Sequence, residues 1–228
     1  ACGVAQIMGI RLMRNFKRPY FATNIRDFWS RWHISLTSWF RDYLYIPLGG
    51  NRKGKLRKQL NVLIVFCVSG LWHGASWNFV IWGALHGLMQ VLYNLFSPLK
   101  KEKNVSFSTN LRNGILTFAF VDFAWFFFRT SSLQEAFGIL GQMTKELGDF
   151  TSILEVLGDG DRNLLVVGLL ILFIVDFAHE KGISIINWVK KQEIWFRYVL
   201  YIGIIASCIY LGVHSEIDEA RQFIYFQF

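Results

Sequence analysis

The chain has 228 residues, of which 53% are hydrophobic and 17% are aromatic, and it carries a net charge of +8. Soluble domains are about 45–50% apolar, so the excess is modest, but the apolar residues gather into long uncharged runs with the charge between them. A basic protein can bind nucleic acid. Here the basic residues are confined to particular connections, which argues against a nucleic-acid partner and for a membrane protein.

The beginning of the chain, residues 1–10, is apolar and does not start with Met. It resembles the end of a membrane helix, so we expect the chain to be a piece of a longer protein. Cys2, Cys67 and Cys208 are odd in number and far apart. They predict neither a disulfide nor a metal site.

The segment from residue 24 to 43 reads as one amphipathic helix at the membrane boundary. Asn24, followed by Asp27 three residues later, is typical of a helix N-cap. An aromatic-rich face then recurs at helical spacing. Its members are Trp29, Trp32, His33, Leu36, Phe40 and Tyr43. For most of them a role as an interfacial anchor is the simpler interpretation.

The charge pattern predicts the membrane topology. Residues 1–59 hold 12 basic and 2 acidic residues, whereas residues 130–162 hold 2 basic and 6 acidic ones. Basic excess marks cytoplasmic connections. We therefore expect 1–59, 98–112 and 179–197 inside, and 130–162 and the C-terminus outside, with membrane crossings at 113–128, 164–178 and 198–213.

Residues 60–97 contain no Lys, Arg, Asp or Glu and have basic flanks at both ends. As a single helix they would be about 57 Å long, which is too long for one crossing. A bent or re-entrant pair of helices explains both facts. The break is expected at residues 70–74, which include two glycines and place His73 at the bend. Irregular backbone at membrane depth is tolerated where it is buried in protein or lines a wet cavity.

Histidines are the candidates for chemistry, because ionisable groups inside a membrane are costly and usually functional. His73, at the expected break, is the strongest. For His33, packing and function explain the position about equally well, and for His86 a buried hydrogen-bonded role is at least as good an explanation as catalysis. An imidazole can accept a proton near neutral pH and serve as a general base. No Gly-x-Ser-x-Gly pattern is present, so direct transfer with a histidine base is favoured over a covalent enzyme intermediate.

Several motifs resemble those of one known family. Residues 26–36 (RDFWSRWHISL), 41–52 (RDYLYIPLGGNR), 69–77 (SGLWHGASW) and 82–87 (WGALHG) resemble signatures of the membrane-bound O-acyltransferase family. The ending 223–228 (FIYFQF) and the stretch 44–50 are similar to its alginate O-acetyltransferase branch. The combination is highly specific for the family, although it covers mainly residues 20–97.

The resemblance implies an all-α, multi-pass bundle in a bacterial cytoplasmic membrane: a ring of tilted helices around a tunnel, of which residues 1–228 would be the C-terminal half of a single domain. His73 takes the family's invariant histidine position and His33 the second one. It implies no bound cofactor and no metal, but acetyl-CoA or another acyl thioester as donor, membrane lipid around the helices, and an extracytoplasmic acetyl-acceptor or transferase protein as partner. Candidates for lining the tunnel are Trp29, Trp32, Trp72, Trp77 and His86.

The sequence is therefore compatible with three functions. The leading hypothesis is acetyl transfer to hydroxyls of an extracytoplasmic polysaccharide. D-alanyl transfer to teichoic acid uses the same chemistry. A transporter would also suit a re-entrant segment with buried histidines, but the sequence shows no internal repeat, and the Trp-His motifs favour an enzyme.

The topology can be tested with single cysteines in a variant from which the three native cysteines have been removed. Because the charges of 49–59 and 130–162 are opposite in sign, Lys53→Cys should resist an impermeant thiol reagent in intact cells and react after lysis. A cysteine in 130–162 serves as the exposed control. Labelling of Lys53→Cys without lysis would contradict the predicted orientation.

Overall fold

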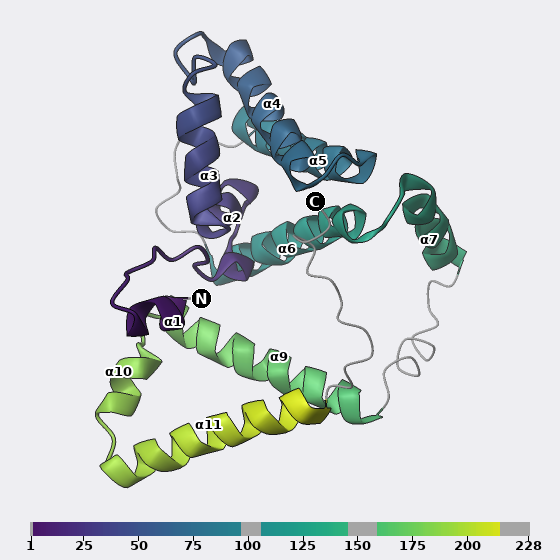
Figure 1. The fold of residues 1–228 in the computed structure, drawn as a ribbon. Coiled ribbons are helices and arrows are strands. Elements are labelled where there is room, and N and C mark those ends of the chain that lie inside the picture. Colours follow the sequence, from purple (N-terminus) through teal and green to yellow (C-terminus); the bar gives the residue numbers. More distant parts are fainter. Residues whose placement is uncertain (1, 97–105, 146–158, 215–228) are drawn as a thin grey trace. The chain divides into compact units, whose positions relative to one another are not determined.

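The computed structural model describes residues 2–96, 106–145 and 159–214, and this part of the chain is helical, with no strand (Figure 1). The predicted all-helical class is confirmed to that extent. The chain divides into two compact units, residues 1–149 and 150–228, which are described separately. That residues 1–228 form half of a single membrane domain stays a prediction, and the tail 223–228 lies outside the described residues.

The first unit contains most of the helices. They are α1 (Cys2–Ile7), the 3-10 helix η1 (Pro19–Phe21), α2 (Ile25–Arg31), α3 (Ile34–Phe40), the π-helix η2 (Arg41–Tyr45), α4 (Lys55–His73), α5 (Trp77–Phe96), α6 (Phe107–Arg129) and α7 (Leu133–Lys145). The second unit contains α9 (Asp159–Glu180), α10 (Ile185–Lys190) and α11 (Ile194–His214).

Three of the described helices are long and apolar enough to cross a membrane: α5, α6 and the Asn163–Glu180 part of α9. The predicted crossings at 113–128 and 164–178 lie inside α6 and α9. The third, at 198–213, lies inside α11, whose described apolar stretch Ile194–Tyr210 is shorter. In the second unit the side chains of α9 and α11 are largely exposed. Apolar helices with this exposure suit contact with lipid or with further protein.

Residues 60–96 of the uncharged run fold as an antiparallel pair, α4 and α5, packed side by side (Figure 1). Glycines set the distance between the two helices. A Cβ on Gly70 would collide with the carbonyl oxygen of Phe79, and one on Gly83 would collide with that of Phe66. Small residues let helix backbones approach this closely. The hairpin returns the chain to the end at which it started, as the basic flanks at both ends predicted.

The turn of this hairpin is slightly later than predicted. α4 continues through Gly70 to His73, and the chain turns at Gly74, whose φ of 157° lies in a region that favours glycine. Gly70 is therefore a packing residue rather than part of the break. The prediction that His73 lies at the bend is confirmed, because it is the last residue of α4.

The prediction of one continuous amphipathic helix over residues 24–43 is wrong. The Asn24 cap is confirmed, since its side-chain oxygen accepts from the Asp27 amide at 2.9 Å. The helix then stops after Arg31 and restarts at Ile34. The carbonyl of Arg31 and the amide of Ile34 bond instead to the chain at residues 15–17, at 2.9 Å each. This pairing replaces two helical hydrogen bonds and divides the segment into α2 and α3.

The core of the first unit lies beneath α2. Phe28 and Ile25 of α2 pack with Ala22 and with Val121 of α6, and all four are buried. Met89 and Tyr93 of α5, and Trp125 of α6, pack around this cluster. Because α2 is held between α5 and α6, the chain that follows α2 is fixed close to the α4–α5 hairpin.

The glycine contact between α4 and α5 can be tested with a matched pair of variants. Gly83→Ala should separate the helices and lower folded protein in the membrane, with a destabilisation of about 1–3 kcal/mol. Gly138→Ala on α7, where an added Cβ meets nothing within 4 Å, should be neutral or slightly stabilising, because alanine favours helix. The two variants are compared by their abundance in the membrane and by their melting temperature in detergent. Equal behaviour of the two variants would contradict the close packing.

Candidate active site

His33 lies at the junction between α2 and α3, in a left-handed backbone conformation with φ 43° and ψ 54°. Non-glycine residues rarely adopt it, although histidine does so more readily than most. His33 occupies the N-cap position of α3, yet its side chain makes no capping hydrogen bond. Its Nδ1 atom is buried and has no hydrogen-bond partner among the described residues. The left-handed backbone between α2 and α3 thus sets the direction in which the His33 side chain leaves the chain.

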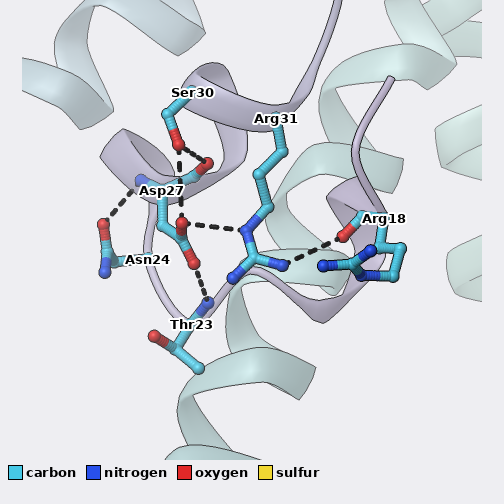
Figure 2. Close-up of polar contacts among 6 residues, drawn as sticks. All are labelled: Arg18, Thr23, Asn24, Asp27, Ser30 and Arg31. Carbon is cyan, nitrogen blue, oxygen red and sulfur yellow. Dashed lines mark hydrogen bonds and ion pairs between the residues drawn. The ribbon is translucent and has the colours of Figure 1, made fainter. Parts of the chain in front are cut away.

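A polar network fixes α2 and hence the chain leading into His33 (Figure 2). The carboxylate of Asp27 accepts from Arg31 Nε at 2.9 Å and from the Thr23 amide at 3.4 Å. Arg31 also donates to the carbonyl oxygen of Arg18 at 3.5 Å. The network joins the two ends of α2 to each other and to the preceding chain. Asp27 is therefore structural, and the sequence had indicated it only as part of a cap.

His73 lies at the other side of the site, at the tip of the α4–α5 hairpin. Its half-buried ring stands perpendicular to Trp82 of α5 at a centroid distance of 5.5 Å. The ring of Phe128, from α6, lies 4.9 Å away at a steep angle. Three helices therefore converge on this histidine, and its two ring neighbours limit how the imidazole can turn.

The structure brings His33 and His73 together. The two residues are 40 positions apart in the chain, but they lie close enough that a positive charge on His33 would disfavour a positive charge on His73. Burial lowers the pKa of His33 below its ordinary value of 6.5. At neutral pH His33 is then mostly uncharged and can accept a proton or a hydrogen bond. Two imidazoles within electrostatic reach of each other form the candidate active site.

His86 lies behind this pair, in an aromatic enclosure. It is completely buried, and neither ring nitrogen has a partner among the described residues. The rings of Trp29 and Trp82 each lie 5.0 Å from it, and their indole N–H groups are also without acceptors. Buried polar atoms are normally hydrogen-bonded. A water molecule or a polar atom of a substrate at this position would therefore supply the missing hydrogen-bond partners.

The other predicted lining residues lie in different surroundings. Trp32 stacks on Phe28 at 5.6 Å and approaches Trp125 at 4.8 Å, on the core side of α2. Trp72 contacts the ring of His73 at 4.9 Å and is half exposed. Trp77, at the start of α5, is 72% exposed. Trp29, Trp72 and His86 thus have ring contacts with His73 or Trp82, and the lining role of all five stays a prediction.

Sequence reasoning missed Trp82 and Phe128 as members of the site. Trp82 connects His73 to His86, and it could have been suggested by its four-residue spacing from His86 on one helix face. Phe128 lies in an apolar run that carries no distinguishing signal. Among the described residues no group of three or more His, Cys, Asp or Glu could hold a metal ion.

Comparison with known proteins gives one family. Residues 2–133 match the sequence model of the MBOAT, membrane-bound O-acyltransferase, family. A peptidoglycan O-acetyltransferase of Helicobacter pylori is 42% identical over 143 residues, which is 63% of this chain and 27% of that protein. A probable alginate O-acetylase AlgI of Pseudomonas syringae is 43% identical over the same shares. A teichoic acid D-alanyltransferase of Bacillus subtilis is 34% identical over 56% of this chain and 35% of that protein.

The chain spans between about a quarter and a third of the length of these curated relatives. The resemblance identified from residues 26–36, 41–52, 69–77 and 82–87 is confirmed, because all four segments lie within the matched region.

Substitution of His33 separates its backbone role from its side-chain role. His33→Ala places an alanine in the left-handed region at a cost of about 1–2 kcal/mol, whereas glycine adopts that conformation freely. Both variants should lower acyl transfer by about 10²-fold, and His33→Gly should keep wild-type abundance in the membrane. Transfer by His33→Gly at the wild-type rate would show that the imidazole has no part in the reaction.

Proposed function

Since the chain belongs to the membrane-bound O-acyltransferase family, we propose that it forms the histidine-bearing part of an enzyme that transfers an acetyl group from a thioester to hydroxyls of an extracytoplasmic polysaccharide. Two relatives at 42–43% identity are named for O-acetylation, one of peptidoglycan and one of alginate. A polymer of the same class, alginate-like or a cell-wall glycan, is the proposed acceptor.

The observation that carries this proposal is the electrostatic proximity of His33 to His73, whose ring is held between those of Trp82 and Phe128. His73 accepts the proton of the acceptor hydroxyl while the hydroxyl oxygen attacks the thioester carbonyl carbon. The carbon–sulfur bond then breaks, and the proton passes from His73 to the departing thiolate. The products are the ester and a free thiol, so no further reactant is needed.

His33 has a complementary role in this scheme. Because burial favours its neutral form, one ring nitrogen carries a hydrogen and the other accepts. The N–H can donate to the thioester carbonyl oxygen, where negative charge develops as the hydroxyl attacks. Donors held in place at that position stabilise the transition state without having to reorganise. The two histidines would then act as base and as oxyanion donor on opposite sides of one carbonyl.

The hairpin geometry supports delivery of the donor from the cytoplasmic side. His73 lies 18 residues along α4 from Lys55, a rise of about 27 Å, and the basic segment at 52–58 is at the opposite end of that helix. A donor whose anionic head group stays near this basic segment must therefore reach the site with an extended arm. Acetyl-CoA, or an acyl carrier protein with a similar arm, has the required shape.

The proposal also covers the membrane, the substrate tunnel and the acceptor side around these helices. We place them in a bacterial cytoplasmic membrane, in a ring of tilted helices around a tunnel in which Trp29, Trp72 and His86 contact substrate and Trp32 and Trp77 lie at its margins. The acceptor, or a transferase protein that relays the acetyl group to it, meets the site from the extracytoplasmic side. Lipid covers the exposed apolar faces of α9 and α11.

D-alanyl transfer is the second candidate. One relative at 34% identity is named a teichoic acid D-alanyltransferase, and the same pair of histidines could act on a D-alanyl thioester. The higher identity to the O-acetylating relatives favours acetyl transfer. The full-length protein in vesicles, supplied in parallel with labelled acetyl-CoA and a labelled D-alanyl thioester, distinguishes the two by which label enters polymer.

Substitutions at His73 test the base. A general base contributes about 10²–10⁴-fold to rate, so His73→Ala should lower transfer by at least about 10²-fold. His73→Gln retains hydrogen bonding but cannot usefully accept a proton, and it should not restore activity. Labelled acetate in polymer per folded enzyme is the measurement. Near-wild-type transfer by a well-expressed His73→Gln protein would refute the assignment.

A further inference from the structure

The first turn of α3 is not capped by the side chain of its own N-cap residue. The first amides of a helix have no partner within it, and the side chain of the N-cap residue commonly accepts from one of them. At α3 the N-cap residue is His33, whose side chain makes no such bond. Acceptors for the amides of Ile34 and Ser35 must come from elsewhere in the chain.

Asn15 supplies both acceptors. Its backbone carbonyl oxygen accepts from the Ile34 amide at 2.9 Å, and its side-chain oxygen accepts from the Ser35 amide at 3.0 Å. Asn15 is half-buried and lies about twenty residues before the helix that it caps. One residue thus satisfies the first two amides of α3 from outside the helix.

The chain around Asn15 also holds the other side of the junction. The amide of Lys17 donates to the carbonyl oxygen of Arg31 at 2.9 Å. The ring of Phe16 packs edge-on to Trp32 at 4.8 Å and lies 5.9 Å from the His33 ring. Residues 15–17 therefore bridge the end of α2 and the start of α3, with the left-handed His33 between the two attachment points.

We propose that Asn15 is a positioning residue for His33. By capping α3 in place of the N-cap side chain, it stabilises the left-handed turn and leaves the imidazole available to the site that contains His73. Residue 15 acts through His33 and does not touch the substrate. The inference rests on the proposed function, because it gives the position of His33 a consequence for catalysis.

The two variants at position 15 differ in which hydrogen-bond acceptors they keep for the first amides of α3. Asn15→Ala removes the side-chain acceptor but retains the backbone bond to Ile34, so the fold should persist. Asn15→Asp keeps an oxygen for the Ser35 amide, and a negative charge is favourable at a helix N-terminus. Ser132→Ala is the matched control, because Ser132 Oγ accepts from the Glu135 amide at 3.1 Å in the first turn of α7.

The experiment measures kcat and KM for labelled acetyl-CoA in the full-length protein, per amount of folded enzyme in detergent. Asn15→Ala should lower kcat by about 10- to 100-fold, since displacing a reacting group by about 1 Å costs up to about 10²-fold, with little change in KM. Asn15→Asp should restore most of kcat, and Ser132→Ala should behave as the wild type. In a His33→Gly background, Asn15→Ala should cause almost no further loss.

Three results would overturn the positioning role. These are an unchanged kcat in Asn15→Ala, an equal further loss when His33 is already glycine, and a failure of Asn15→Ala to fold despite its remaining backbone bond. Wild-type activity of His33→Gly would instead contradict the proposed catalytic role of His33, and an absence of acetyl transfer in the wild type would contradict the proposed function. An inactive His33→Gly beside a fully active Asn15→Ala would contradict only the role of Asn15.

Discussion

The close approach of α4 and α5 is the constraint on which the candidate site depends. Gly70 and Gly83 let each helix lie against the carbonyl groups of the other. This places His73 at the tip of a tight hairpin and directs Trp82 toward both His73 and His86. With larger residues at these glycines the helices would separate, and the ring contacts that limit the orientation of His73 would be lost.

A second constraint acts on the other histidine. His33 reaches the same region only because the chain breaks between α2 and α3 and adopts a left-handed conformation there. Such a conformation is unfavourable by about 1–2 kcal/mol for most residues. Unfavourable backbone conformations of this kind cluster at functional sites, where the surrounding structure holds them in place. Here the Asp27 network on one side and residues 15–17 on the other supply that support.

Much of the architecture was predictable from the sequence, because charge and apolarity along a membrane chain are strongly segregated. The uncharged run 60–97 and its basic flanks predicted the hairpin, and the position of His73 at its bend followed. The break at His33 was not predictable, because the residues from 29 to 43 have helical spacing throughout and the competing hydrogen bonds come from a distant segment. Phe128 was missed for a related reason, since apolar runs do not show which ring faces a site.

The central claim is that His33 and His73 belong to one site, and chemical cross-linking tests it directly. In a variant without native cysteines, His33→Cys and His73→Cys would be treated with a short bifunctional thiol reagent, and cross-linked peptides would be identified by mass spectrometry. Asn78→Cys with Thr130→Cys is the positive control, because the side-chain Nδ2 of Asn78 donates to the backbone carbonyl oxygen of Thr130 at 2.7 Å. The account predicts an intramolecular link between positions 33 and 73. Modification of both cysteines without a link, in a protein whose control pair cross-links, would contradict it.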